Sequence, residues 1–371
     1  MLHRSLLYLS SAALLAPLAS ASALANGHEL EALRAGSSDT STVRLGGFLR
    51  TRYANSSDVA VGGHDLGGFS LDFARLEIDG GVGPFAVHVS LEGSSSTPDT
   101  PVTYGSGGGH WGMFGDVEQV GAVGVLDAHA TVRVADHFHI RAGQFLVPFN
   151  ANSAVRDDQQ LFLNHTVNGE HWRFRDTGLE LGGEYERFGW RVAVMNGFDG
   201  AGDELALFAR VQADVLDAGA PSNEGALGAG DGRHLRVGAG YYNDDGNNAD
   251  DIAMGFDASY VQGALSAMFE LVSYDDGATS IFTDNQQGQT TVAGDRTAWT
   301  LQGGWLFDPK WEAAARFEDL GDDGDTTVMS FAVNRYFEGH AAKVQIAYSS
   351  ASSDVDALEA DILAVGLTVR L

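Results

Sequence analysis

Apolar and polar residues alternate along most of the chain from residue 43 onward, and this period of two is typical of β-strands with one apolar face. In the last such segment, every second residue from Leu363 to Leu371 is leucine or valine, and the residues between them include Thr368 and Arg370. Each segment is about as long as a tilted strand that crosses a bilayer. The pattern predicts sixteen strands, over residues 43–53, 69–79, 85–92, 122–133, 138–147, 175–186, 189–197, 204–215, 233–243, 252–262, 264–274, 296–307, 310–319, 326–336, 341–350 and 360–371.

The connections between these predicted strands differ in length according to their order along the chain. Most odd-numbered connections are long and acidic, such as residues 93–121 and 148–174, whereas most even-numbered ones are tight turns, such as Arg187-Phe188 and Asp308-Pro309. One connection, residues 216–232, is long where a tight turn is expected. Loops sorted in this way, on an even number of strands, are typical of transmembrane β-barrels and not of soluble β-sandwiches.

The two faces of each strand indicate which side meets lipid. Charged residues fall opposite the leucines and valines, so we expect apolar side chains on the outside of a barrel and polar side chains in its interior. Trp190, Trp299, Trp305 and Trp311 lie near strand ends, where aromatic residues meet a membrane surface. The alternative is that they fill the core of a soluble β protein. The sequence therefore predicts an all-β fold, a 16-stranded antiparallel transmembrane β-barrel over residues 43–371.

The first 25 residues have a different pattern. After Arg4, an apolar run over residues 6–19 leads to Ala23-Leu24-Ala25, a small-x-small cleavage pattern. We interpret residues 1–25 as a signal peptide and residues 26–42 as a short periplasmic N-terminal segment. An N-terminal anchor helix is the alternative to a signal peptide. The location that follows is the outer membrane of a Gram-negative bacterium, with the lipid of that membrane around the barrel.

Composition narrows the possible chemistry. The chain has no Cys, which excludes disulfides and cysteine zinc sites. Its net charge is −28, or −29 once residues 1–25 and their one arginine are removed, and this disfavours nucleic acid as a partner. The sequence has no GxSxG, HExxH, Walker or dinucleotide-binding motif, so we expect no enzyme activity and no cofactor. No acidic cluster has the spacing of an EF-hand loop, so we expect no metal site, and weak binding of divalent cations by the acidic loops is the alternative.

Four short motifs carry a resemblance to a known family. Gly143-Gln144-Phe145, Val147-Pro148-Phe149, Arg175-Asp176-Thr177-Gly178 and Asn196-Gly197 resemble, in this order, the fingerprint of the phosphate-selective porin O and P family of Gram-negative outer membranes. The resemblance implies a homotrimer through which small inorganic anions, phosphate or polyphosphate among them, diffuse passively. The C-terminal strand is similar to the signal that outer-membrane assembly machinery reads, although its last residue is leucine and not aromatic.

The third long connection, residues 148–174, occupies the position of the constriction loop in sixteen-stranded porins. Its apolar centre, Leu161-Phe162-Leu163, would be costly on an exposed loop. We therefore expect this third extracellular loop to fold inward and pack on the wall. An ordinary cap over the mouth of the barrel is the alternative.

The alternation along each strand shows which cations face the interior, and the loop at residues 148–174 adds further cations. We expect these cations to line the pore and bind anions, because a guanidinium can bind an oxyanion with two hydrogen bonds. Inward acids such as Glu180 and Asp257 are nearly as numerous, so arginine–carboxylate pairs that serve stability alone are an alternative. The only lysines are Lys310 and Lys343, which weakens the case for phosphate selectivity. A general or cation-preferring porin and a non-conducting structural barrel are therefore the other interpretations. The candidate anion-binding residues are Arg44, Arg50, Arg52, Arg75, Arg133, Arg141, Arg156, Arg173, Arg191, Arg210, Arg236, Arg316 and Lys343.

Overall fold

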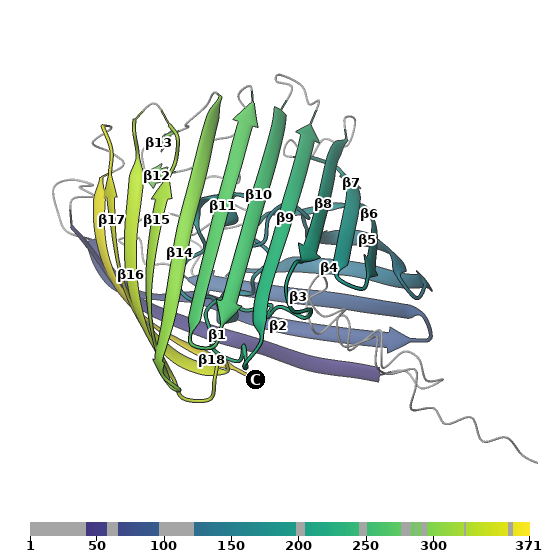
Figure 1. Cartoon of the computed structure of the whole chain (residues 1–371), viewed down its shortest axis with the longest axis horizontal. Helices are drawn as coiled ribbons and strands as arrows, with labels where there is room; N and C mark the ends of the chain where they lie inside the picture. Colours follow the sequence, from purple (N-terminus) through teal and green to yellow (C-terminus); the bar gives the residue numbers. More distant parts are fainter. Residues whose placement is uncertain are drawn as a thin grey trace, which may run out of the picture.

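The fold is a closed barrel of sixteen antiparallel strands (Figure 1). This computed structural model describes residues 42–57, 66–95, 122–197, 205–244, 251–275, 283–285, 288–290, 295–322, 324–354 and 359–371. The wall strands are β1 (Thr42–Ser57), β2 (Leu66–Val82), β3 (Phe85–Ser95), β4 (Ala122–Ala135), β5 (Phe138–Leu146), β6 (Arg175–Tyr185), β7 (Phe188–Met195), β8 (Ala206–Asp214), β9 (Arg233–Asp244), β10 (Asp251–Gln262), β11 (Leu265–Asp275), β14 (Arg296–Asp308), β15 (Trp311–Asp319), β16 (Thr327–Tyr336), β17 (Ala342–Ser352) and β18 (Ala360–Arg370).

Each wall strand pairs with the next one along the chain, β11 pairs with β14, and β18 returns to pair with β1. The closing register places Leu49 opposite Val369 and Tyr53 opposite Val365. Each of the sixteen segments predicted from the sequence corresponds to one wall strand, so the prediction of a 16-stranded antiparallel barrel is confirmed.

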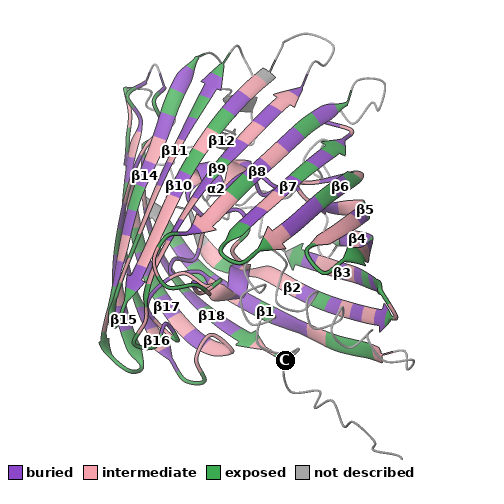
Figure 2. Cartoon of the chain, turned by 45° about the vertical axis from the view of Figure 1, so that its right-hand side comes forward, coloured by how far each residue is buried: buried purple, intermediate pink, exposed green. Residues whose placement is uncertain are grey.

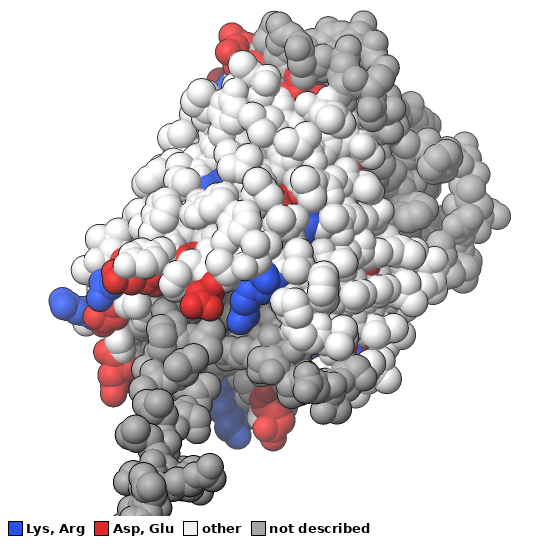
Figure 3. Space-filling view, turned by 90° about the vertical axis from the view of Figure 1, so that its right-hand side faces the viewer, with Lys and Arg blue, Asp and Glu red and all other residues white. Residues whose placement is uncertain are grey.

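Burial alternates along the wall strands, as the stripes in Figure 2 show. On β18, Leu363 and Val365 are 51% and 40% exposed, whereas Ala364 and Thr368 are 5% and 0% exposed. Figure 3 shows the outside of the wall as a broad surface with few charged side chains, and acids and bases gather at its lower edge. The outer face is thus apolar and the buried face polar, the reverse of a soluble barrel.

Tight turns connect the strands at one end of the barrel. Gly83, Gly263 and Gly339 lie at these turns with φ of 56°, 56° and 58°, and Glu186 has φ of 54° in the turn between β6 and β7. Hairpin turns of this kind require a positive φ because their twist then matches that of the strands. Residues 215–232, between β8 and β9, are the long connection at this end of the barrel.

The remaining elements are short. β12 (Thr283–Asn285) and β13 (Gly288–Thr290) form a separate hairpin within a connection that the sequence pattern assigns to a loop. η3 (Asp157–Gln159) and α2 (Val167–His171) lie between β5 and β6. Among the described residues, no helix is long and apolar enough to cross a membrane. The expected signal peptide and N-terminal segment lie outside the described residues, apart from Thr42.

Candidate functional site in the barrel lumen

The connection between β5 and β6, residues 147–174, lies against the buried face of the wall. The carbonyl oxygen of Leu163 accepts a hydrogen bond of 2.9 Å from Nη1 of Arg50. The carbonyl oxygen of Gln160 accepts one of 2.6 Å from Nζ of Lys343. Buried donors are costly when unsatisfied, so these wall cations stabilise the connection in this position.

Further contacts come from the same part of the wall. Nη2 of Arg52 donates to Oδ1 of Asn164 at 2.7 Å, and Nη1 of Arg316 donates to the carbonyl oxygen of Asn164 at 3.1 Å. Together with Arg50 and Lys343, these donors belong to β1, β15 and β17, which are close in the ring because β18 pairs with β1. These donors therefore fasten the middle of residues 147–174 to one half of the barrel, whereas Phe149 and Asn152 are bonded to Arg210 on β8 and Glu270 on β11.

Apolar contacts hold the middle of the connection on that half. The side chains of Leu161, Phe162 and Leu163 are buried, and a β-carbon at Gly366 would lie 2.3 Å from Cδ2 of Leu163. Small wall residues let the connection approach the strands closely. The wall residues that share one buried hydrophobic cluster with these three side chains are Ala54, Ala314, Ala332, Ala347, Ala360, Ile362 and Ala364.

Asp157, in η3, lies at the centre of a buried group of cations. Its carboxylate oxygens lie 2.5 Å from Nη2 of Arg173, 2.7 Å from Nη2 of Arg75 and 3.9 Å from Nη2 of Arg50. Burial acts to raise the pKa of Asp157, but the charges of Arg173 and Arg75 outweigh it and hold that pKa well below its usual range. Nε2 of His165 lies 3.4 Å from the same carboxylate, and burial lowers the pKa of His165 to about 4. The imidazole is therefore neutral at pH 7.

The four motifs that resemble the porin family lie where residues 147–174 leave the wall. Gly143 has φ of 127°, and a β-carbon there would lie 2.3 Å from the carbonyl oxygen of Ala128. Oδ2 of Asp176 accepts a hydrogen bond of 2.7 Å from the backbone nitrogen of Gly197. The ring of Phe149 stacks on Trp172 with 3.7 Å between centroids. These contacts fix the base of the connection.

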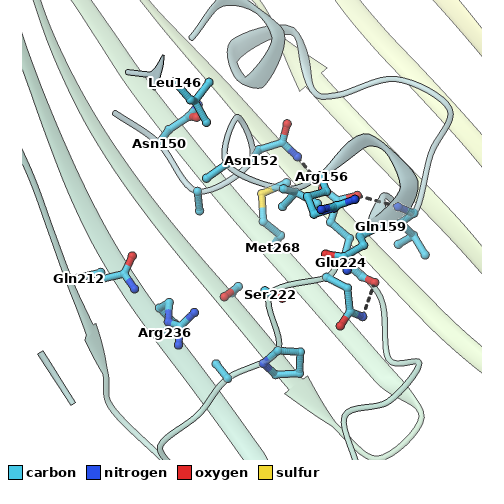
Figure 4. Close-up of a pocket in the computed structure, with 18 of the residues that line it drawn as sticks. Leu146, Asn150, Asn152, Arg156, Gln159, Gln212, Ser222, Glu224, Arg236 and Met268 are labelled. Carbon is cyan, nitrogen blue, oxygen red and sulfur yellow. Dashed lines mark hydrogen bonds between the residues drawn. The ribbon is translucent and has the colours of Figure 1, made fainter. Parts of the chain in front are cut away.

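A cavity of about 370 Å³ lies between this connection, residues 215–232 and the opposite half of the wall (Figure 4). Arg141 on β5, Arg191 on β7, Arg210 on β8 and Arg236 on β9 line it from neighbouring strands. Arg191 and Arg210 are directly opposite each other in the register of β7 and β8. Like charges in this arrangement destabilise a sheet unless opposite charges offset them.

Carboxylates accompany the arginines of the cavity. Arg210 lies 2.7 Å from Oδ2 of Asp257, and Nε of Arg236 lies 2.7 Å from Oδ1 of Asp214. Nη1 of Arg141 lies 3.4 Å from Oε1 of Glu180. These arginines therefore both line the cavity and form ion pairs, so the two interpretations of the inward arginines are not exclusive.

The structure places most of the candidate cations in the interior, in two groups. Arg133 is half-buried, and Arg44 is exposed near the start of β1. Those that line the cavity are Arg141, Arg156, Arg191, Arg210 and Arg236. Arg156 also belongs to residues 147–174, and Arg210 also contacts them through the carbonyl oxygen of Phe149. The other candidates that belong to residues 147–174 or contact them are Arg50, Arg52, Arg75, Arg173, Arg316 and Lys343.

Several residues of the lumen are not among the candidates that the sequence provides, and two of them are titratable residues of the segment between β8 and β9 and of β9 itself. Glu224 lines the cavity from residues 215–232, and His234 lines it from β9. The sequence does contain one indication of Glu224. It is an acid in the middle of a glycine- and alanine-rich connection, and that connection is long although it lies at the end of the barrel where the other connections are tight turns.

Comparison with solved structures shows which proteins share this barrel. OmpF of Salmonella typhi, solved in complex with daunomycin, has a TM-score of 0.61 at 13% identity, over 90% of this chain and 98% of that chain. The outer membrane channel DcaP of Acinetobacter baumannii has a TM-score of 0.57 at 13% identity, over 89% and 97%. OmpT of Vibrio cholerae, an outer membrane protein solved in a trimer form, has a TM-score of 0.54 at 16% identity, over 90% and 100%. The chain has the fold of Gram-negative outer-membrane porin barrels.

Sequence comparison adds no closer assignment. No family model matches the chain, and no curated protein matches it. The resemblance to the phosphate-selective porins therefore stays a prediction from short motifs.

Proposed function

We propose that this protein is a porin of a Gram-negative outer membrane, through which small solutes diffuse passively. The exposed leucines, valines and aromatic residues of the wall support this location, because such an outer face is stable only against lipid. The buried face is polar and borders a cavity, as a water-filled channel requires. In this orientation the long connections face the outside of the cell and the tight turns face the periplasm.

We propose that the channel prefers small anions, and one observation carries this proposal. Among the described residues that line the cavity, six arginines face only two acids, Asp127 and Glu224. The carboxylates of Asp257, Asp214 and Glu180 pair with the arginines but are not part of the lining. A passing ion therefore meets guanidinium groups first. The lining arginines are Arg141, Arg156, Arg191, Arg210, Arg236 and Arg370.

Inorganic phosphate is the solute that the family resemblance implies. Guanidinium groups on neighbouring strands suit its oxygens, since each can donate two hydrogen bonds. No lysine is among the described residues of the lining, and Nζ of Lys343 donates to the carbonyl oxygen of Gln160. We therefore propose passage of small anions with phosphate among them, and not a dedicated phosphate site.

We also propose that residues 147–174 act as the constriction loop and that the protein assembles as a homotrimer. The hydrogen bonds from Arg50 and Lys343 support the first proposal, because they hold the loop across the lumen side of the wall. The barrel shared with OmpT of Vibrio cholerae, solved in a trimer form, supports the second.

Single-channel recording in planar bilayers tests this function. The purified protein should give stepwise conductance, and its reversal potential in a KCl gradient should show that chloride permeates more readily than potassium. Added phosphate should reduce the chloride current. A potassium preference would replace the anion porin with a cation-preferring one, and absence of conductance would identify a structural barrel.

A further inference from the structure

Residues 215–232 join β8 to β9 at the tight-turn end of the barrel, yet they do not form a tight turn. The strand ladder continues for a short distance, since Val215 N donates to the carbonyl oxygen of Leu235 at 2.7 Å and Asp217 N to that of Arg233 at 2.9 Å. A two-residue turn between Asp217 and Arg233 would complete this hairpin. The chain instead inserts many more residues, and their contacts lie inside the barrel.

The middle of this segment reaches a distant part of the wall. Ala226 N donates to Oε1 of Glu312 on β15 at 2.7 Å, and the hydroxyl of Tyr336 donates to Oε2 of the same carboxylate at 2.7 Å. Strands β10, β11 and β14 separate β9 from β15 in the ring. Gly225 has φ of 82°, and a β-carbon there would lie 2.7 Å from Oε2 of Glu312. This crossing of the lumen thus requires glycine at position 225.

The segment also meets residues 147–174, which enter the lumen from the opposite end. Oε2 of Glu224 accepts a hydrogen bond of 2.8 Å from the backbone nitrogen of Leu161, and Oε1 accepts one of 2.5 Å from Nδ2 of Asn152. The backbone nitrogen of Glu224 donates to the carbonyl oxygen of Gln159 at 3.1 Å. Figure 4 shows Asn152, Gln159 and Glu224 together at the edge of the cavity. Glu224 therefore joins two segments that come from the two ends of the barrel.

We infer that residues 215–232 form a second constriction element, entering from the tight-turn end, and that Glu224 is the positioning residue that fastens it to the first. This inference rests on the proposed porin function and adds to it a residue that sets the cross-section of the pore. Ala226 and Ala229 pack near Val261 of the wall, whereas Glu224 makes the hydrogen bonds to residues 147–174. Loss of the Glu224 carboxylate should therefore loosen the segment without altering the strands.

Four variants separate this role from a charge effect. Glu224→Ala removes both acceptor oxygens, and Glu224→Gln removes the same charge but keeps one acceptor oxygen and the same volume. Asp231→Asn is the matched control, because Asp231 is an exposed carboxylate of the same segment. In the fourth variant, Asn-Gly replaces residues 218–232 and closes the hairpin directly.

The measurement is the passage of neutral sugars of increasing mass into proteoliposomes, since uncharged solutes report the cross-section independently of ion preference. We expect Glu224→Ala and the shortened variant to raise the size limit and to increase single-channel conductance by about two-fold or more, because pore diameter governs both. Glu224→Gln should lie between Glu224→Ala and the unchanged protein. Asp231→Asn should match the unchanged protein. Heat-modifiable migration on gels confirms that each barrel is folded.

The outcomes distinguish this inference from the function on which it rests. If the unchanged protein conducts and neither Glu224→Ala nor the shortened variant alters the sugar limit, the second constriction is wrong and the porin function stands. If the unchanged protein is closed and the shortened variant conducts, the segment is confirmed as the element that closes the barrel. If no variant conducts, the porin function is wrong, and this inference fails with it.

Discussion

The guanidinium of Arg210 on β8 reaches across β9 to the carboxylate of Asp257 on β10, with distances of 2.7 Å and 2.9 Å for its two hydrogen bonds. It passes over Gly238, where a β-carbon would lie 2.5 Å from Nη2 of Arg210 and 2.6 Å from Oδ1 of Asp257. Such paired, charge-assisted hydrogen bonds are stronger than neutral ones. The pair connects three strands and offsets part of the charge that Arg210 presents to the cavity.

The first prediction concerns this pair. Asp257→Asn should raise the permeability of anions relative to cations, because the positive charge of Arg210 then lacks its counter-charge. Arg210→Ala should lower the same ratio, because the carboxylate remains. Reversal potentials in a KCl gradient measure both effects. Arg335→Ala is the control, since Arg335 lies over the ring of Trp311 on the outer side of the wall, 5.0 Å from its centroid. Equal ratios for all three variants would mean that the pair has no influence on permeating ions.

The second prediction concerns Asp157, whose carboxylate forms ion pairs with Arg173 at 2.5 Å and with Arg75 at 2.7 Å. Asp157→Asn removes the negative charge while the buried arginines remain. Breaking one partner of a buried ion pair costs about 3–5 kcal/mol. We therefore expect a clear fall in the temperature at which the barrel unfolds in detergent, measured by circular dichroism.

The control for this prediction is Asp136→Asn, in the turn between β4 and β5. Asp136 is exposed, and surface ion pairs contribute only about 0–1 kcal/mol. Its unfolding temperature should stay close to that of the unchanged protein. Equal temperatures for both variants would show that the arginines around Asp157 need no counter-charge.

The third prediction concerns acid stability. Burial lowers the pKa of His165 to about 4, below the value of 6.5 expected in the unfolded chain. Protonation of His165 therefore favours unfolding. The free energy of unfolding is unaffected by this protonation above about pH 6.5, and it falls by roughly 3 kcal/mol as the pH falls toward about 4. His171, whose pKa burial lowers to about 3, acts in the same direction. Asp157 contributes to acid unfolding only at lower pH, because its pKa lies well below 3.8.

Unfolding temperatures recorded from about pH 7 to about pH 4 measure this loss. His165→Gln should flatten the pH dependence, although it lowers stability at neutral pH. His137→Gln, at an exposed turn position, should keep the full dependence. If His165→Gln leaves the pH dependence of the unfolding temperature unchanged, groups other than His165 cause the acid unfolding.

The strands could be predicted from the sequence because lipid and water impose opposite requirements on neighbouring positions. Leu363 and Val365 meet the outside and Ala364 and Thr368 the interior, so the period of two is visible without any knowledge of contacts. Ion pairs could not be predicted in the same way. The pair of Arg210 and Asp257 depends on the register of β8, β9 and β10 together, and strand phase gives only the face of each residue.

The path of the connections inside the barrel was even harder to predict from the sequence than the ion pairs. Leu161-Phe162-Leu163 gave a signal because an apolar run needs burial wherever it lies. Residues 215–232 are rich in glycine and alanine, so only their length set them apart. Their position depends on hydrogen bonds between Glu224 and backbone groups, which composition does not encode. Arg44 has the expected phase, but its place at a strand end leaves it exposed.

The fourth prediction concerns orientation in the membrane. The chain has no Cys, so a single introduced thiol can be labelled selectively. Asp354→Cys lies after β17 at the long-connection end, and Asp136→Cys lies in a turn at the opposite end. A maleimide attached to a polymer too large to pass through the channel should label Asp354→Cys at once when added to intact cells, and Asp136→Cys only after the outer membrane is opened. The reverse order would invert the orientation that we propose.

The last prediction concerns the net charge of −28, which argues for cations, and the arginines of the cavity, which argue for anions. Acidic pairs such as Asp250-Asp251 and Asp275-Asp276 occur in the sequence at the borders of the predicted long connections, where we expect water and salt to screen them. Salt screens charges beyond about 10 Å at 0.1 M and about 3 Å at 1 M. The acids of the mouth should therefore lose influence on ions as the salt concentration rises.

The arginines act at shorter range. An ion in a cavity of about 370 Å³ passes close to Arg141, Arg191 and Arg210, and the low-dielectric wall strengthens their effect on it. Anion preference should therefore persist or increase between about 0.1 M and 1 M KCl, because screening removes the repulsion of the mouth first. Reversal potentials at both concentrations measure this. A channel that favours potassium at both concentrations would show that the paired carboxylates, and not the guanidinium groups in front of them, control the ions that pass.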